Sequence, residues 1–70
     1  MPLSLASLNH IYIIQRIGGQ VEIKKHLEKL GFIIGGSIEV KVKTGGNLIV
    51  RVKDSRVAIS EEMARKIIVS

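Results

Sequence analysis

Hydrophobic and polar residues alternate most regularly in two neighbouring stretches, residues 37–43 and 48–53. A β-strand points successive side chains to opposite faces, so this period of two predicts strands with one buried face. Between them, residues 44–47 read Thr-Gly-Gly-Asn, and glycine tolerates the positive φ of a tight hairpin turn. The alternation also predicts that four basic residues of this hairpin share one face: Lys41, Lys43, Arg51 and Lys53.

Residues 11–17 form another predicted strand, because they are rich in β-branched side chains. Their hydrophobic residues do not alternate cleanly, so we expect both faces of this strand to be partly covered. The segment before it contains Leu3, Leu5 and Leu8, which we expect to pack inward.

One long helix is predicted, over residues 20–30. Three aliphatic residues recur at i, i+4 and i+7 from Ile23 onward, which places them on one helix face. Gly31 follows at the position where helices commonly end in the left-handed conformation. We therefore expect the helix to stop there and Phe32 to fold back against its last turn.

The last third of the chain predicts a strand around residues 57–59, a short helix and a final strand. Ser60 is a typical N-cap for a helix over residues 61–66, and residues 67–69 read as the last strand. Five short strands joined by tight turns predict a mainly β fold, a small barrel in a single domain over residues 1–70. One helix follows the first strand, and the short helix precedes the last.

Composition adds an excess of aliphatic side chains and a basic balance. Ile, Val and Leu make up 25 of the 70 residues, more than one small core can enclose, so we expect aliphatic surface to meet a partner or a second copy. The net charge of +5 suits nucleic acid or an acidic protein. Only Tyr12 and Phe32 are aromatic, so a stacking platform is missing and we expect no nucleic-acid partner.

No group of residues has the arrangement that catalysis needs. The chain lacks cysteine, its serines have no neighbouring histidine, and its few carboxylates lie among lysines, so we predict a binding protein and not an enzyme. The glycine doublets match no phosphate-binding loop and suit turns. No apolar run approaches the roughly 20 residues that span a bilayer, so we expect no direct membrane insertion.

A metal site is the one cofactor site that the residues suggest. Glu22 and His26 are spaced i, i+4, so both side chains can reach one ion from a single helix face. Stable transition-metal sites use three or four ligands, so His10 or a symmetry mate would have to complete the set. The ion would be Fe(II) or another divalent transition metal; the alternative is an exposed Glu–His pair without metal.

Three segments together resemble the FeoA family. Residues 25–40 read KHLEKLGFIIGGSIEV, with a helix ending in Leu-Gly-Phe, a glycine turn and a strand; residues 5–8 read LASL, and residues 64–69 read ARKIIV. The resemblance implies an SH3-like barrel, a cytoplasmic location and a role in prokaryotic ferrous iron uptake beside the FeoB membrane transporter. Ile34 departs from the family pattern, which commonly has proline before the turn glycine.

Three hypotheses follow. In the first, the protein docks on the cytoplasmic G-protein part of FeoB through partner-binding residues on the helix and the following turn: Lys25, Lys29, Phe32, Ile33 and Ile34. In the second, it is a metal-responsive regulatory module, and in the third a nucleic-acid-binding SH3-like module. A homo-oligomer is compatible with each of them.

Overall fold

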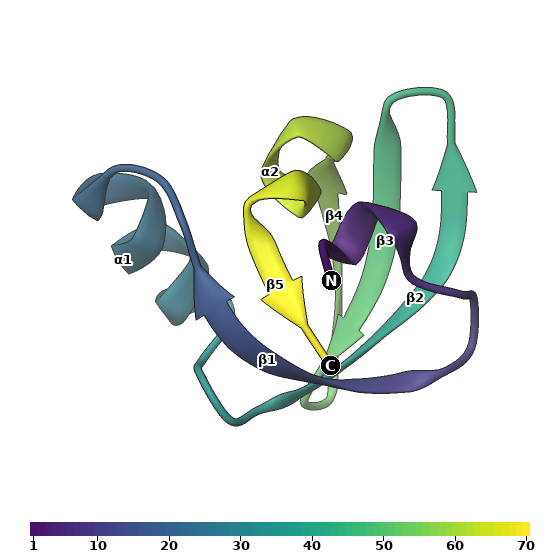
Figure 1. Cartoon of the computed structure of the whole chain (residues 1–70), viewed down its shortest axis with the longest axis horizontal. Helices are drawn as coiled ribbons and strands as arrows, with labels where there is room; N and C mark the ends of the chain where they lie inside the picture. Colours follow the sequence, from purple (N-terminus) through teal and green to yellow (C-terminus); the bar gives the residue numbers. More distant parts are fainter.

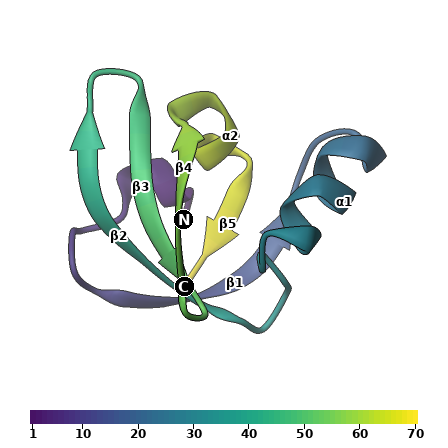
Figure 2. The ribbon, with the colours of Figure 1, turned by 180° about the vertical axis from the view of Figure 1, so that it is seen from behind.

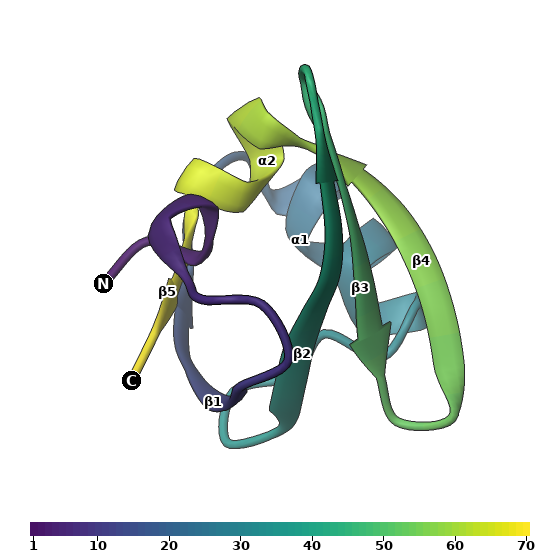
Figure 3. The same ribbon diagram turned by 90° about the vertical axis from the view of Figure 1, so that its right-hand side faces the viewer.

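Five strands form one antiparallel sheet in the order β4-β3-β2-β1-β5, as seen in a computed structural model that describes all 70 residues (Figure 1). The sheet curls strongly, so that β1 and β5 face β3 and β4 across the core in an incompletely closed SH3-like barrel (Figure 3). The mainly β prediction is confirmed. The elements are η1 (Leu3–Leu5), β1 (Ile11–Ile17), α1 (Val21–Lys29), β2 (Ser37–Thr44), β3 (Asn47–Val52), β4 (Ser55–Ser60), α2 (Glu61–Arg65) and β5 (Ile67–Val69).

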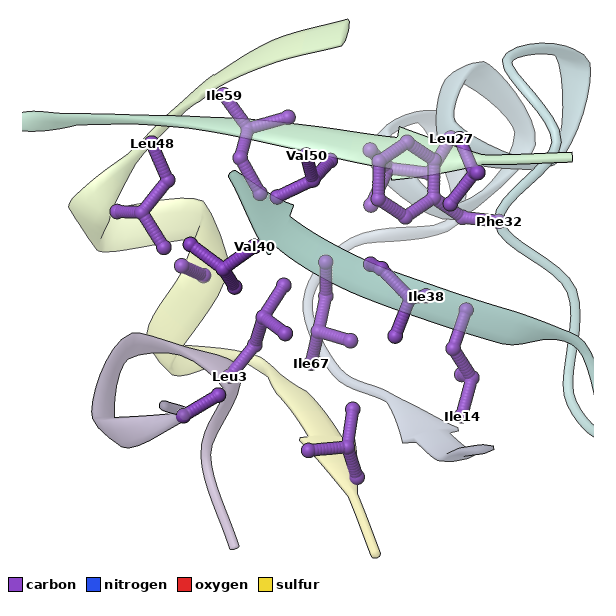
Figure 4. Close-up of a cluster of buried hydrophobic side chains, with 14 of the residues drawn as sticks. Leu3, Ile14, Leu27, Phe32, Ile38, Val40, Leu48, Val50, Ile59 and Ile67 are labelled. Atoms are coloured by element: carbon purple, nitrogen blue, oxygen red, sulfur yellow. The ribbon is translucent and has the colours of Figure 1, made fainter. Parts of the chain in front are cut away.

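The core is a single cluster of 15 buried side chains, all of them apolar. Phe32 is its largest fully buried member and lies beside Leu27 at one end, whereas Leu48 and Ile59 lie toward the other (Figure 4). Burying a large apolar side chain contributes roughly 1.5–3 kcal/mol, so these residues supply most of the driving force for folding.

The end of α1 directs the chain into this core. The Phe32 amide donates to the Leu27 carbonyl and the Gly31 amide to the Glu28 carbonyl, both at 3.0 Å. With φ of +106° at Gly31, these two bonds form a Schellman motif, as the glycine predicted. Figure 2 shows the helix standing to one side of the sheet.

A bulge in β2 divides the predicted basic face. The pairing of β2 with β3 shifts between Val40 and Val42, so Val42 lies opposite Ile49 and Lys43 lies opposite Leu48. An extra residue reverses the faces of everything beyond it. Val42 is therefore 42% exposed instead of buried. The prediction that Lys43 shares a face with Arg51 is wrong, and its Nζ donates instead to the Ser4 carbonyl at 3.2 Å.

The predicted covering of the first strand and of the N-terminal leucines is also wrong in part. In β1, Ile11 and Ile13 are exposed, because its outer face lies against no other layer. Leu3 is buried as expected, whereas Leu5 is 71% exposed and Leu8 is also exposed. A single turn of 3-10 helix cannot point side chains two residues apart to the same side.

The glycine at the end of α1 gives a stability prediction. We expect Gly31→Ala to lower the free energy of unfolding by about 1–2 kcal/mol, because a Cβ at positive φ is strained. A Cβ there would meet nothing closer than 3.7 Å, so the loss would come from backbone strain and not from a clash. Urea unfolding measures it.

The control is Gly45→Ala in the β2–β3 turn. Gly45 does not have a positive φ, and its added Cβ would meet nothing within 4 Å. We expect Gly45→Ala to change the free energy of unfolding by less than about 0.5 kcal/mol. Equal losses in the two variants would contradict the special role of Gly31.

Candidate docking site

A pocket of about 260 Å³ lies between α1, the end of β1 and the turn that precedes β2. Its lining is mostly apolar and consists of Ile17, Lys24, Glu28, Phe32, Ile33 and Ile34. Concave apolar sites with a few polar groups at the margin are where partners and ligands usually bind. This pocket is therefore the candidate functional site of the molecule.

The floor and the rim of the pocket differ in exposure. Phe32 is fully buried, and its ring belongs to the core as well as to the pocket wall. Ile33 and Ile34 are exposed, with 69% of Ile34 accessible. An exposed aliphatic pair beside a rigid apolar floor allows an apolar side chain from another molecule to be buried on both sides.

The rim is held by a hydrogen-bonded turn. The Gly36 amide donates to the Ile33 carbonyl at 3.0 Å, and Gly35, the third residue of the turn, has φ of +87°. These are the features of a type II turn, in which the second position favours proline. The Gly35 amide also donates to the Ile14 carbonyl at 2.8 Å, and the Ile14 amide to the Gly36 carbonyl at 2.9 Å. The turn is thus fixed to β1, and Ile34 occupies the position where proline would be compatible.

The structure brings together only part of the predicted partner-binding set. Phe32, Ile33 and Ile34 line the pocket, whereas the helix contributes Lys24 and Glu28 in place of Lys25 and Lys29. At 100° per residue, Lys25 and Lys29 point away from the buried Leu27, on the far side of α1. At the same spacing, Lys24 lies about 60° and Glu28 about 100° to one side of Leu27, so both reach the margin of the pocket.

The predicted metal ligands are not assembled into a site within one chain. Glu22 and His26 are exposed on α1, and His10 lies just before β1, with its ring 6.1 Å from that of Tyr12. No group of three or more His, Asp or Glu side chains lies close enough to hold an ion. The pair Glu22–His26 stays a prediction that needs ligands from elsewhere.

Comparison with known proteins identifies the fold. The FeoA domain matches residues 1–70. A crystal structure of an iron uptake regulatory protein, FeoA, is 28% identical, with a TM-score of 0.86 over 99% of this chain and 92% of that one. The zinc complex of FeoA from Stenotrophomonas maltophilia, described as a prokaryotic SH3 domain protein, is 25% identical, with a TM-score of 0.86 over 100% and 89%.

A third structure, FeoA from Chlorobium tepidum, shares the fold with a TM-score of 0.92 at 18% identity, over 99% of this chain and 68% of that one. No curated protein matches the chain in sequence. None of its helices has the length and apolar character needed to cross a membrane.

Fold and comparisons together define a small SH3-like domain of the accessory kind found in transport systems. The chain belongs to the FeoA family, which is associated with ferrous iron transport.

The turn at the rim gives a second stability prediction. We expect Ile34→Pro to raise the free energy of unfolding by about 0.4–1 kcal/mol, because proline suits the second position of a type II turn and restricts the unfolded chain. The Ile34 amide donates no hydrogen bond that proline would remove. Thermal unfolding measures the change, and a loss of stability would contradict the assigned turn type.

Proposed function

We propose that this protein is a cytoplasmic accessory factor of ferrous iron uptake that binds the G-protein part of an FeoB-type transporter through the pocket beside α1. The exposed pair Ile33 and Ile34 above the buried Phe32 carries the proposal. Membership in the FeoA family supplies the transport context.

The chemistry of the pocket indicates how such a partner would bind. An apolar side chain of the partner would enter between Ile34 and Phe32, where burial is worth roughly 1.5–3 kcal/mol. Lys24 and Glu28 stand i, i+4 at the helix margin and form no ion pair with each other. Both charges are therefore free to fix the orientation of the partner, as rim charges do at protein interfaces.

Calorimetry with the purified cytoplasmic domain of the cognate FeoB tests the proposal. We expect Ile34→Ser to weaken binding roughly tenfold to a hundredfold, because it removes one buried aliphatic contact. Ile34→Pro should weaken binding while leaving the fold more stable, which separates loss of contact from loss of structure.

Ile11→Ser is the matched control. Ile11 is 71% exposed against 69% for Ile34, and it lies on the outer face of β1, outside the pocket. It should change the affinity by less than about twofold, since exposed apolar residues outside a contact contribute little. No binding of the wild-type protein at tens of micromolar, or equal losses in the two serine variants, would reject this docking surface.

A second candidate function is metal-responsive regulation through the helix pair Glu22 and His26. The spacing on one exposed face of α1 favours it, and the S. maltophilia relative is a zinc complex. Because a single chain offers only two of these ligands and the length of β1 separates its own His10 from α1, a second copy would have to complete the site, with its His10 as one candidate ligand.

Calorimetric titration with Zn(II) tests the metal site. His26→Ala should abolish the binding heat, because removing one of two ligands from a helix leaves no chelate. His10→Ala shows whether His10 takes part. An unchanged isotherm for His26→Ala would eliminate the site.

A further inference from the structure

The two edge strands of the sheet, β5 and β4, differ in whether other residues pair with their outer side. At the β5 edge, the Met1 amine donates to the Val69 carbonyl at 2.7 Å and the Val69 amide donates back to Met1 at 2.7 Å, so the N-terminal residues cover it. At the opposite edge, β4 pairs only with β3. None of the backbone hydrogen bonds outside the regular elements involves residues 55–59.

No other strand of the sheet lies beyond β4. In Figure 3 this strand forms the outer margin of the ribbon, and Figure 2 shows α1 set apart from it, on the side away from β3. Half of the six residues of β4 are exposed, and Val57, which faces the core, is only half-buried. A row of unpaired backbone donors and acceptors is a template for another strand.

A row of charged side chains crosses the outer face of the sheet and ends at this edge. On the outer face of the sheet, Glu39 of β2, Arg51 of β3 and Arg56 of β4 stand in one cross-strand row. Glu39 pairs with Arg51 at 3.7 Å and with Lys41 at 3.1 Å. Arg56 has no carboxylate partner, and its one neighbour in the row is another arginine.

Like charges directly opposite each other destabilise a sheet. The Arg51–Arg56 pair is therefore unfavourable, and of the two arginines only Arg51 has a carboxylate partner. A carboxylate on the free side of Arg56 would extend the row from β2 outward with alternating charge.

We propose that the free edge of β4 accepts an extended segment of a partner protein that carries an acidic residue opposite Arg56. The backbone of β4 supplies the ladder of hydrogen bonds, and Arg56 selects the acidic residue. The next residue of the segment on the core side would cover the half-buried Val57, and an aliphatic or small residue would lie opposite Ala58. This surface is separate from the pocket beside α1.

A second copy of the chain fits this edge poorly. An antiparallel β4–β4 pairing centred on Arg56 or Val57 would bring two Arg56 side chains near one another while each already faces Arg51. Charged residues at edge strands oppose this kind of self-pairing. Charge thus favours an acidic partner strand over a dimer.

The probe is a blocked peptide of sequence Thr-Val-Thr-Val-Glu-Thr-Gly, which in antiparallel register sets its glutamate opposite Arg56. We expect amide NMR shifts to change along β4 and at Arg51 when the peptide is added. The same peptide with lysine in place of glutamate should bind roughly threefold to thirtyfold more weakly, since an attractive cross-strand pair becomes repulsive.

Arg56→Glu should reverse this preference, and Arg56→Gln should remove it. Arg16→Glu makes the same change of charge at an exposed position of β1 and should leave the preference intact. A peptide N-methylated at alternate amides should fail to bind, because it keeps the side chains and loses the ladder.

Four results would overturn the proposal. They are no shift of β4 amides at millimolar peptide, equal binding of the glutamate and lysine peptides, equal binding of the N-methylated peptide, and a stronger response of Arg51 and Arg56 to single-stranded oligothymidine than to the peptide. Equal binding of the glutamate and lysine peptides would mean that Arg56 only protects the edge from aggregation. A stronger response to oligothymidine would mean that the outer face around Arg51 and Arg56 binds polyanions.

Discussion

The reversal of the chain at the end of α1 is the constraint on which both core and pocket depend. Gly31 takes a conformation that other residues adopt only with strain, and this turns Phe32 back under the last helical turn. The largest side chain of the core is thereby buried, and the two isoleucines that follow it stay outside. Because one backbone turn decides both, the apolar rim is a consequence of filling the core.

The second organising feature is the bulge in β2, which decides where the charges of the sheet lie. Without the bulge, Lys43 would lie on the same outer face as Arg51, and the hairpin would carry one continuous basic face. With it, Lys43 reaches the carbonyl of Ser4, and Val42 joins Ile49 on the outside. The outer face is therefore divided into an aliphatic row and a charged row, and the charged row ends at Arg56 on a free edge.

Much of this architecture is readable from local patterns. The alternation of residues 48–53, the glycine after the helix and the Ser60 cap all act within a few residues, and each is found as predicted. The Ser60 hydroxyl accepts from the Met63 amide at 3.1 Å. Local chemistry of this kind depends little on the rest of the chain.

The errors have a different physical origin. A bulge is set by how two strands match over their whole length, so the alternation of β2 alone could not reveal that Val42 would turn outward. The exposure of Leu5 depends on which turn of helix forms before β1. Of the residues predicted to bind a partner, the turn residues line the pocket, whereas Lys25 and Lys29 lie on the far side of α1, a direction that their charge alone does not reveal.

The two surfaces differ in the force that each would use, and this keeps them experimentally separable. Binding in the pocket beside α1 would rest on burial of aliphatic area, which salt strengthens slightly or leaves unchanged. Recognition at β4 would rest partly on an exposed charge pair, which is screened within about 8 Å at physiological ionic strength. Raising the salt concentration should therefore weaken an acidic strand at Arg56 while sparing an apolar side chain beside Phe32. A partner that used both would lose only part of its affinity.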